Sequence, residues 1–436
     1  MTPPGDLAAR VGALDTGSLL PPRRSGAITQ GDVVLRDSVS LGDGLALAVV
    51  TDGDGLLVTP IVARDAEPVR RAEPGDGAFE RLLRRLASGA PGGRFSFEPF
   101  GSVPAAAGER AIDVDQSNES VVVGDRAVVK LYPRTGGSPD AGSDLPAHLI
   151  SVGFTSIPTP YGIVGWRDDD GHHKVVASAA SYLPGARDGW EWYLAGLLAW
   201  LDGEVDDEAA FETASVLGRL AAHMHIALAT GSEIVPTPRG TANEATAQAW
   251  RRGARTVADE ALAVTDGEQG KRLTLRRNAI LAELDRLGEA AEAVLTRVHG
   301  DFHAGQVLEW QGGYAVTDFD GDPMASPTTH DSLDTPVRDV AAFVRSIDHL
   351  GRIASSRRAG SEAAVSEWIG SSRAGFLGAY RSELAVRGEE RLYDERLLRP
   401  LEVAQECHEY IYAARFLPGW LRVADLAMCS LISLED

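Results

Sequence analysis

Residues 299–323 read H-G-D-F-H-A-G-Q-V-L-E-W-Q-G-G-Y-A-V-T-D-F-D-G-D-P. Two histidines and four aspartates lie around a segment whose pattern predicts a short β-hairpin. Such a set of polar side chains suits three interpretations: a metal-binding hydrolase centre, a phosphoryl-transfer centre, or a solvated polar turn. The spacing inside the stretch and the segments around it have to distinguish between them.

The spacing favours phosphoryl transfer. This reaction needs a carboxylate that orients the attacking hydroxyl, ligands for the metal ion that bridges the phosphates, and a cation on the phosphates. Asp301 and Gln306 stand five apart, and Asp318 follows twelve residues later in D-F-D-G, which resembles the catalytic loop and the Asp-Phe-Gly of kinases. The Gln306 amide and the Asp318 and Asp320 carboxylates offer hard oxygen ligands that suit Mg²⁺. Upstream, Lys130 ends V-V-K on a predicted strand and supplies the cation.

The other two interpretations explain less of the chain. A hydrolase centre would use His299, Asp301 and His303 as metal ligands, but it also needs a Gly-Asn-His element and later histidine pairs. His330 and His349 stand alone in the sequence, so that second set is missing. We therefore expect His299 and His303 to support the site and not to bind metal. A polar turn would explain neither the fixed spacings nor the lysine hairpin that precedes them.

Composition and charge limit the class of protein. The 436 residues are enough for two or three domains, and 44% apolar with 24% charged residues is ordinary for a soluble globular chain. The net charge of −21 argues against nucleic acid and anionic membranes as partners. Cys407 and Cys429 are too few for a disulfide framework, and no signal peptide or membrane span is evident. We expect a cytoplasmic protein.

The secondary-structure pattern divides the chain into three parts and predicts an α+β fold. Residues 1–92 read as a small β-rich module with strands over 30–63, closed by a helix near 77–89. Residues 93–185 read as a second β-rich part that carries the Lys130 hairpin. Residues 186–436 read as mainly helical, and the hairpin at 307–318 is expected to be the only strand pair there.

Six segments carry a resemblance to a known family. They resemble actinobacterial maltokinases and their relatives in the aminoglycoside-phosphotransferase, eukaryotic-kinase-like superfamily, over nearly the whole chain. The resemblance implies a bilobal kinase fold with an N-terminal cap (1–92), an ATP-binding N-lobe (93–185) and a helical C-lobe (186–436), together with ATP, Mg²⁺ and a small sugar as acceptor. The segments are Q-S-N-E-S (116–120), Lys130, S-Y-L-P-G-A-R-D-G-W-E-W (181–192), V-H-G-D-F-H-A-G-Q-V-L (298–308), D-F-D-G-D-P (318–323) and P-V-R-D-V-A-A-F-V-R-S (336–346).

The resemblance also implies roles for individual residues. Asp301 would be the catalytic base, and Gln306 and Asp318 would hold Mg²⁺, with Asp320 as a further carboxylate. On the nucleotide side, Lys130 would contact the phosphates and pair with Asp144, which is one methylene shorter than the family's glutamate. The remaining nucleotide contacts would come from Ser117 and Asn118 over the phosphates and from the hinge Ser181, Tyr182 and Leu183 beside adenine.

Two departures bear on the substrate. Maltokinases read D-F-E-G-E-P and G-D-L-H where this chain reads D-F-D-G-D-P and G-D-F-H, and Ala413 and Phe416 replace a Glu and an Asn in the C-terminal helix. The altered form resembles a branch of actinomycete glucosamine kinases. Glucosamine, giving the 6-phosphate, is thus the expected substrate; maltose phosphorylated at the anomeric hydroxyl is the alternative, and an aminoglycoside is the third. A non-catalytic nucleotide-binding regulator would be expected to have lost at least one of the key residues.

One predicted helix, near 394–415, suits an aminosugar. Its acidic and amide side chains recur at intervals of three and four and so share one face, unless that face is simply solvated. This face, with His303 and Asp301, would bind the ammonium group and hydroxyls; Arg415 could order the carboxylates, and Trp420 could stack on the sugar. Trp190, Trp192, His223 and His225 are expected to serve packing. The face comprises Glu402, Gln405, Glu406, Glu409 and Tyr412.

Overall fold

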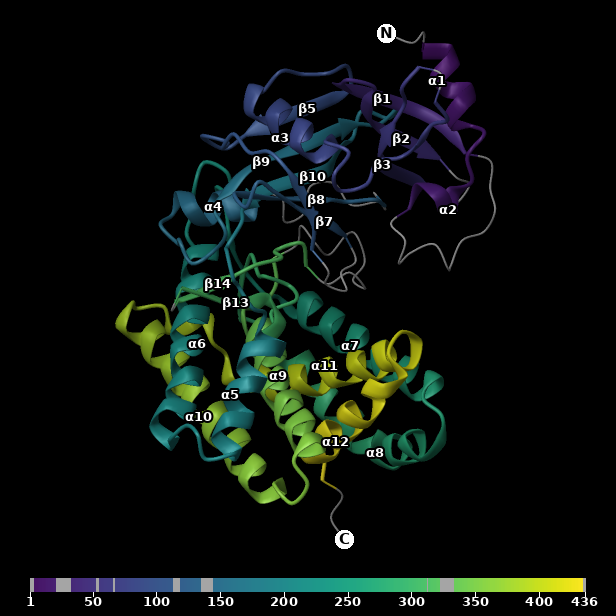
Figure 1. Ribbon diagram of the computed structural model, residues 1–436. Coiled ribbons are helices and arrows are strands. Elements are labelled where there is room, and N and C mark those ends of the chain that lie inside the picture. Colours follow the sequence, from purple (N-terminus) through teal and green to yellow (C-terminus); the bar gives the residue numbers. More distant parts are fainter. Residues whose placement is uncertain are drawn as a thin grey trace. The chain divides into compact units, whose positions relative to one another are not determined.

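The computed structural model describes residues 4–20, 33–51, 55–65, 67–112, 118–134, 144–311, 313–321 and 333–433. They form two compact units. One comprises the described parts of Met1–Ala147 and Pro158–Pro184, and the other the described parts of His148–Ile157, Gly185–Asp322 and Ser332–Asp436. Sheets dominate the first and helices the second, so the α+β prediction is confirmed (Figure 1). The predicted three-part division stays a prediction; its first boundary falls inside one unit.

The first unit begins with a four-stranded antiparallel sheet that is buried on both faces. Because side chains alternate along a strand, odd-numbered residues of β2 enter one hydrophobic core and even-numbered residues enter a second. Gly42, Asp43 and Gly44, at the turn between β1 and β2, all have positive φ. The elements are α1 (Pro4–Val11), α2 (Thr16–Leu19), β1 (Val34–Gly42), β2 (Leu45–Thr51), β3 (Leu56–Val62) and β4 (Arg70–Arg71).

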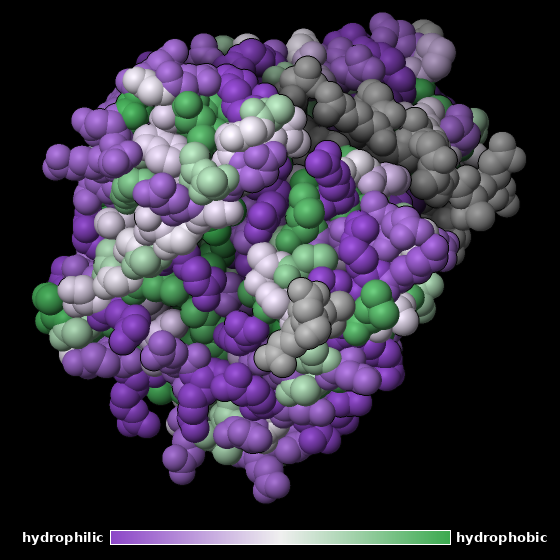
Figure 2. Space-filling view, turned by 90° about the horizontal axis from the view of Figure 1, so that it is seen from below, coloured by the Kyte–Doolittle hydropathy of each residue, from purple (hydrophilic) through white to green (hydrophobic). Residues whose placement is uncertain are grey.

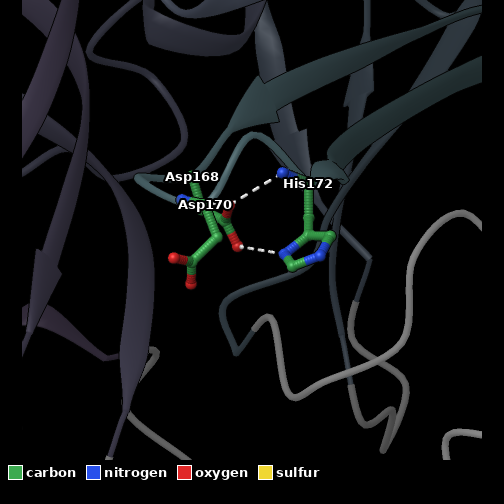
Figure 3. Close-up of side chains that lie close together, drawn as sticks. All are labelled: Asp168, Asp170 and His172. Atoms are coloured by element: carbon green, nitrogen blue, oxygen red, sulfur yellow. Dashed lines mark hydrogen bonds and ion pairs between the residues drawn. The ribbon is translucent and has the colours of Figure 1, made fainter.

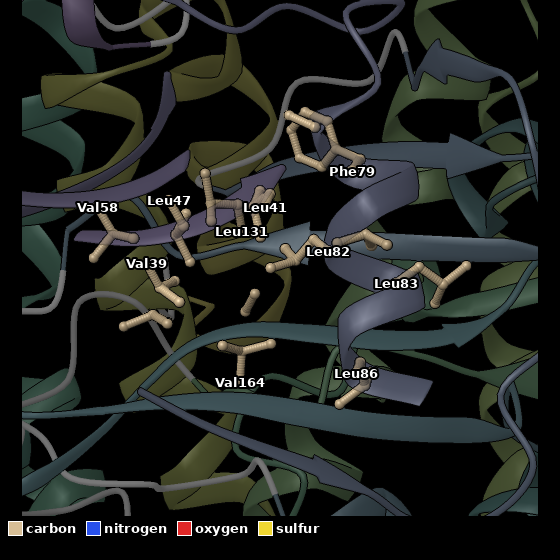
Figure 4. Close-up of a cluster of buried hydrophobic side chains, with 14 of the residues drawn as sticks. Val39, Leu41, Leu47, Val58, Phe79, Leu82, Leu83, Leu86, Leu131 and Val164 are labelled. Carbon is tan, nitrogen blue, oxygen red and sulfur yellow. The ribbon is translucent and has the colours of Figure 1, made fainter. Parts of the chain in front are cut away.

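Helix α3 (Ala78–Ser88) lies against this sheet and against a second, six-stranded antiparallel sheet in the same unit. Its apolar stripe, predicted from the 3/4 spacing, is buried in a core that both sheets share (Figure 4). Lys130 lies on β8, where Ser120 of β7 and Ser178 of β10 flank it in register. The strands, in sheet order, are β5 (Phe95–Pro99), β9 (Pro160–Arg167), β10 (His173–Ser181), β8 (Ala127–Leu131), β7 (Glu119–Val123) and β6 (Glu109–Ala111).

The second unit is organised around α9 (Val337–Arg357), most of which is buried. Figure 1 shows α5, α6 and α10 on one side of α9 and α11 and α12 on the other. Helix α7 ends at Val264, and α8 begins three residues later at Gly267. These helices are α5 (Gly189–Leu201), α6 (Asp207–Leu228), α7 (Glu244–Val264), α8 (Gly267–Asp285), α10 (Glu362–Val386), α11 (Glu395–Arg415) and α12 (Leu421–Leu431).

Two strand pairs lie among these helices, whereas the sequence predicted one. The predicted hairpin is β13 (Val307–Trp310) with β14 (Gly313–Val316), and the second pair is β11 (Arg239–Thr241) with β12 (Val294–Thr296). At three residues each, the latter two strands are too short to show a period in the sequence. The remaining short elements are α4 (Leu145–Ser151), η2 (Arg286–Glu289), η3 (Ala304–Gln306), η5 (Glu390–Leu392) and η6 (Pro418–Trp420).

Figure 2 shows one face of the molecule, on which hydrophilic side chains predominate and hydrophobic ones form scattered patches. Among the residues that the structure describes, none of the helices combines the length and apolarity that crossing a membrane requires. The most apolar segment, 192–200, lies within α5, whose buried side pairs with α9.

Candidate active site

The loop 299–306 is held in place by one buried carboxylate. Asp339, in the first turn of α9, accepts the backbone N–H of His299 at 2.7 Å and that of Gly300 at 3.0 Å. Its side chain is 1% exposed. Burial alone would raise the pKa of Asp339, but its hydrogen bond to His225 and the nearby charges hold that pKa below its usual value. A permanent negative charge therefore fixes the backbone that leads into Asp301.

Asp339 is in turn held by a chain of two buried side chains. Nε2 of His225 lies 3.1 Å from Oδ2 of Asp339, and Nδ1 of the same ring lies 2.8 Å from the hydroxyl of Tyr380. His225, expected only to pack, thus supports the loop, while His223 pairs with Glu383 at 2.8 Å at the surface. The sequence analysis assigned Asp339 no role, although a lone acid in the apolar run P-V-R-D-V-A-A-F was a signal for one.

His299 connects the loop to the hairpin that follows. The ring is 1% exposed, and burial lowers the pKa of His299, so the ring is neutral. Nδ1 accepts the N–H of Asp301 at 3.3 Å, and Nε2 donates to the carbonyl of Thr317 at 2.9 Å. Phe319 packs on the ring with centroids 4.7 Å apart. The histidine thus supports the site, as expected, and orients both Asp301 and the residue before Asp318.

The hairpin returns the chain to the predicted metal ligands. Thr317, just after β14, donates its N–H to the carbonyl of Gln306 at 2.9 Å, so Gln306 and Asp318 lie in neighbouring segments. Asp318 has a φ of +64°, a left-handed conformation that aspartate tolerates better than most residues and that is common at functional sites. The amide nitrogen of Gln306 lies 3.4 Å from Nε2 of His303, which leaves the amide oxygen for a cation. Asp320 follows two residues after Asp318; Asp322 lies outside the described residues.

His303 and Asp301 form the exposed part of the loop. Their side chains are 29% and 31% exposed, and Nε2 of His303 lies 3.8 Å from Oδ2 of Asp301. Nδ1 of His303 accepts the N–H of Gly305 at 3.0 Å. Burial, and then the proximity of His299, lower the pKa of His303 to about 4. The ring is therefore neutral near pH 7 and does not place an imidazolium beside Asp301.

Trp190 lies on this loop and connects it to the C-terminal helices. Its ring is 5.7 Å from that of His303 and 5.8 Å, edge-on, from that of Trp420. Gly305 permits this approach, because a Cβ there would lie 2.5 Å from Nε1 of Trp190, and Gly189 lets the start of α5 lie against the loop, because a Cβ there would lie 2.0 Å from the carbonyl oxygen of Ala304. The expectation of core packing is therefore wrong for Trp190, which is only partly buried.

Trp192, two residues further along α5, does meet that expectation. It is 5% exposed, and its indole N–H donates to the carbonyl of Val307 at 2.9 Å. The two tryptophans thus lie on different faces of the same helix turn.

Part of the predicted acidic face of α11 reaches the same region. The indole N–H of Trp420 donates to Oε2 of Glu409 at 2.8 Å, and the amide of Gln405 donates to Oε1 at 3.3 Å. All three side chains are partly exposed. With Trp190 and His303 they form one group, hereafter the Trp190–Glu409 cluster, of aromatic rings and a carboxylate beside Asp301.

Glu402 and Glu406 do not share this arrangement, which corrects the prediction that they face a substrate. They are 1% and 0% exposed. Both oxygens of Glu402 bind Arg373, one of them at 2.8 Å, and Glu406 accepts from Nε of Arg345 at 3.0 Å and lies 3.1 Å from Nε2 of His349. Helical spacing correctly predicted that these residues share a face of α11. It did not show that arginines inside the helical unit pair with Glu402 and Glu406.

Arg415 also departs from its predicted role. Its guanidinium pairs with Glu260 of α7. The arginine that orders the α11 carboxylates is instead Arg345 of α9, which is 3% exposed and reaches both Glu402 and Glu406. Tyr412, exposed like Arg415, packs against Phe416 with tilted rings whose centroids are 5.6 Å apart.

The predicted nucleotide residues lie in the first unit. The Lys130 ammonium lies 5.6 Å from the centre of the Tyr132 ring. Tyr182 donates its N–H to the carbonyl of Arg126 at 3.0 Å, at the turn of the lysine hairpin. Ser181 accepts the N–H of Thr159 on its hydroxyl at 2.8 Å.

The hinge and the remaining nucleotide residues are placed less fully. Leu183 is 7% exposed and lies one residue before the segment of the first unit that ends at Pro184; its place in a hinge stays a prediction. Asn118 is partly buried just before β7, and Asp144 is exposed just before α4. Ser117 lies outside the described residues, and the pairing of Lys130 with Asp144 stays a prediction.

A separate group of metal-binding side chain types lies in the β9–β10 turn (Figure 3). Asp168, Asp170 and His172 are, among the described residues, the one set of three or more His, Cys, Asp or Glu ligand atoms within 4.8 Å. The carboxylate of Asp168 accepts the N–H of Asp170 at 3.1 Å and that of His172 at 2.8 Å. These hydrogen bonds stabilise the turn, so the three side chains lie close together for a structural reason.

Comparison with known proteins identifies the family. The chain is 38% identical over 434 residues to a glucosamine kinase from Streptacidiphilus jiangxiensis, covering 97% of each chain. It is 34% identical over 401 residues to one from Mycolicibacterium smegmatis, covering 91% of this chain and 98% of that one. No family model matches the sequence.

Solved structures agree with the sequence comparison. A crystal form of a glucosamine kinase superposes with a TM-score of 0.85 at 36% identity, covering 98% of this chain and 99% of that one. A glucosamine kinase in complex with glucosamine, ADP and inorganic phosphate gives a TM-score of 0.81 at 36% identity, covering 99% and 100%. This chain therefore belongs to the glucosamine kinase family.

Proposed function

We propose that this chain transfers the γ-phosphoryl group of ATP to the 6-hydroxyl of glucosamine. One observation carries the proposal: the bond from Thr317 to Gln306 and the His299 bridge bring the hairpin back to the loop of Asp301, in a chain that belongs to the glucosamine kinase family. That arrangement suits a base and hard oxygen ligands acting at one place.

A cytoplasmic location suits an enzyme that uses ATP and contains two free thiols, Cys407 and Cys429.

Each residue of the site has a task that its position permits. Asp301, partly exposed beside a neutral His303, accepts the proton of the sugar hydroxyl and orients it for in-line attack. Gln306 and Asp318 would hold Mg²⁺, with Asp320 as a further carboxylate. When bound there, Mg²⁺ would supply positive charge to the phosphates. Lys130 contributes a second positive charge to them.

The Trp190–Glu409 cluster is the part of the site that suits the acceptor. A carboxylate beside indole rings recognises an ammonium group next to the apolar face of a sugar ring. Glu409 accepts from the neutral indole of Trp420 and the neutral amide of Gln405, whereas Glu402 and Glu406 accept from arginines. We infer that Glu409 and Gln405 bind the amino group of glucosamine and that Trp190 and Trp420 pack against its sugar ring.

The experiment is ATP turnover with a panel of sugars that separates the candidates: glucosamine, glucose, N-acetylglucosamine, maltose and an aminoglycoside. The proposal predicts the highest kcat/KM for glucosamine and a product phosphorylated at the 6-position. Turnover that no sugar stimulates would contradict the kinase assignment. A higher kcat/KM for maltose would support the alternative acceptor, and a phosphate at the anomeric position would contradict the assigned hydroxyl.

A further inference from the structure

The N-terminal cap contacts the lysine hairpin through a buried ion pair. Arg71, in β4 of the cap sheet, binds the carboxylate of Glu119, the first residue of β7. The two side chains are 7% and 11% exposed. Nε of Arg71 and Oε2 of Glu119 have no hydrogen-bond partner within the described ranges, so each charge depends on the other. Removing one partner leaves the other buried and uncompensated, which is strongly unfavourable.

The ion pair also lies next to the residue that faces Lys130 across the hairpin. Glu119 faces Leu131 across the hairpin, and its neighbour Ser120 faces Lys130. Asn118, a predicted phosphate contact, directly precedes Glu119. The ion pair therefore lies at the open end of the hairpin, beside two residues assigned to the phosphates.

The cap also holds the other strand at the same end. The N–H of Val58 in β3 donates to the carbonyl of Pro133 at 2.7 Å, and Leu57 forms a β-bridge with Arg134. These contacts follow three and four residues after Lys130. Below them, cap side chains such as Leu47 and Val58 share one core with Leu131 (Figure 4).

We propose that Arg71 of the cap is a positioning residue for the nucleotide: through Glu119 it fixes the open end of the β7–β8 hairpin and so sets where Lys130 and Asn118 meet the phosphates. The inference rests on the proposed function, since it assigns the cap a task in ATP binding. It distinguishes Arg71 from its neighbour Arg70, which pairs with Asp76 at 2.6 Å and is 49% exposed.

The test is steady-state kinetics of the full chain with ATP and glucosamine varied separately, together with calorimetric titration of ADP. We expect Arg71→Ala and Glu119→Gln each to raise the KM for ATP about tenfold and weaken ADP binding by a similar factor, with the KM for glucosamine within about twofold. Arg70→Ala is the matched control and should behave as wild type. The double variant Arg71→Glu/Glu119→Arg should recover part of the ATP affinity.

Two results would overturn the inference. One is an ATP KM that stays within about twofold of wild type in the charge-removing variants, and the other is an equal rise in both KM values, which indicates general loosening. If Arg71→Ala does not fold, Glu119→Gln decides by the same criteria, because it keeps the shape of the side chain. A wild-type chain without sugar-stimulated turnover would contradict the proposed function instead, and ADP titration would still test Arg71.

Discussion

Asp339 accepts the backbone N–H of His299 at 2.7 Å, although the two residues are 40 apart in sequence. This contact makes the loop 299–306 part of the core of the helical unit, because Asp339 lies on α9 and its other contacts reach α6 and α10 through His225 and Tyr380. A loop fixed in this way can present Asp301 in one orientation, which is what base catalysis requires.

Asp339→Asn should therefore lower kcat by about tenfold or more while leaving the KM for ATP near wild type. An amide offers one acceptor where the carboxylate serves two backbone N–H groups and a histidine, so a buried partner is left unsatisfied, at about 1–3 kcal/mol of unfolding free energy. Kinetics and urea unfolding measure both effects. Tyr380→Phe is the milder control, since it removes the last bond of the chain. An Asp339→Asn variant with full kcat would remove the carboxylate from this role.

Asp301→Asn should abolish turnover and keep ADP binding near normal. Asparagine preserves the size of the side chain but cannot accept the proton of the hydroxyl. Sugar-dependent ATP turnover and ADP titration on the same preparation separate the two properties. Retention of most of the activity would assign the base to another group.

The local part of the site could be predicted from the sequence. Gln306 and Asp318 flank a hairpin that returns the chain on itself, so their spacing predicts that they lie in neighbouring segments, as the bond from Thr317 to Gln306 shows. The apolar stripe of α3 was predictable for the same reason, because burial follows the helical period.

The remaining part depends on contacts that no periodicity encodes. Trp190 and Trp420 come from segments 230 residues apart, and nothing in either segment states that they meet. On α11, the 3/4 spacing placed Glu406 and Glu409 near one face but could not show that Arg345 neutralises the first and leaves the second beside Trp420. Which of these carboxylates forms an internal ion pair depends on the tertiary structure.

Trp190→Ala should raise the KM for glucosamine with little effect on the unfolding free energy. The ring is partly exposed, and its contacts are with His303 and Trp420 of the Trp190–Glu409 cluster. Trp192→Ala, on the same helix, should instead lower the unfolding free energy by about 3–5 kcal/mol, since its ring is buried. Comparing both variants by kinetics and urea unfolding provides the matched control. Equal effects of the two on stability would place Trp190 in the core after all.

Glu409→Gln should reduce kcat/KM for glucosamine more than for glucose, because only the aminosugar loses an ionic contact. Glu402→Gln should leave this ratio unchanged and lower stability, since it leaves Arg373 and the buried Arg345 facing a neutral partner. The ratio of kcat/KM for the two sugars is the measurement. A ratio that changes with Glu402 and not with Glu409 would reverse the assignment.

The last prediction concerns pH and His349, which is 2% exposed and packs edge-on against Trp420 with centroids 5.4 Å apart. Burial alone would lower the pKa of His349, but Glu406, with a smaller contribution from Glu409, outweighs burial and the repulsion of Arg345, so that the pKa is raised above 6.5. The folded chain thus holds this proton more tightly than the unfolded chain does.

The sign of the linkage follows from that shift. The stabilisation is complete below pH 6.5, the unfolded value, and is lost as the pH rises through the higher folded value. The difference in unfolding free energy between wild type and His349→Gln should therefore shrink as the pH rises above 6.5, because glutamine does not titrate. Urea unfolding of both proteins across this range measures it. A difference that grows with pH would mean that His349 is held neutral, and that Glu406 relies on Arg345 alone.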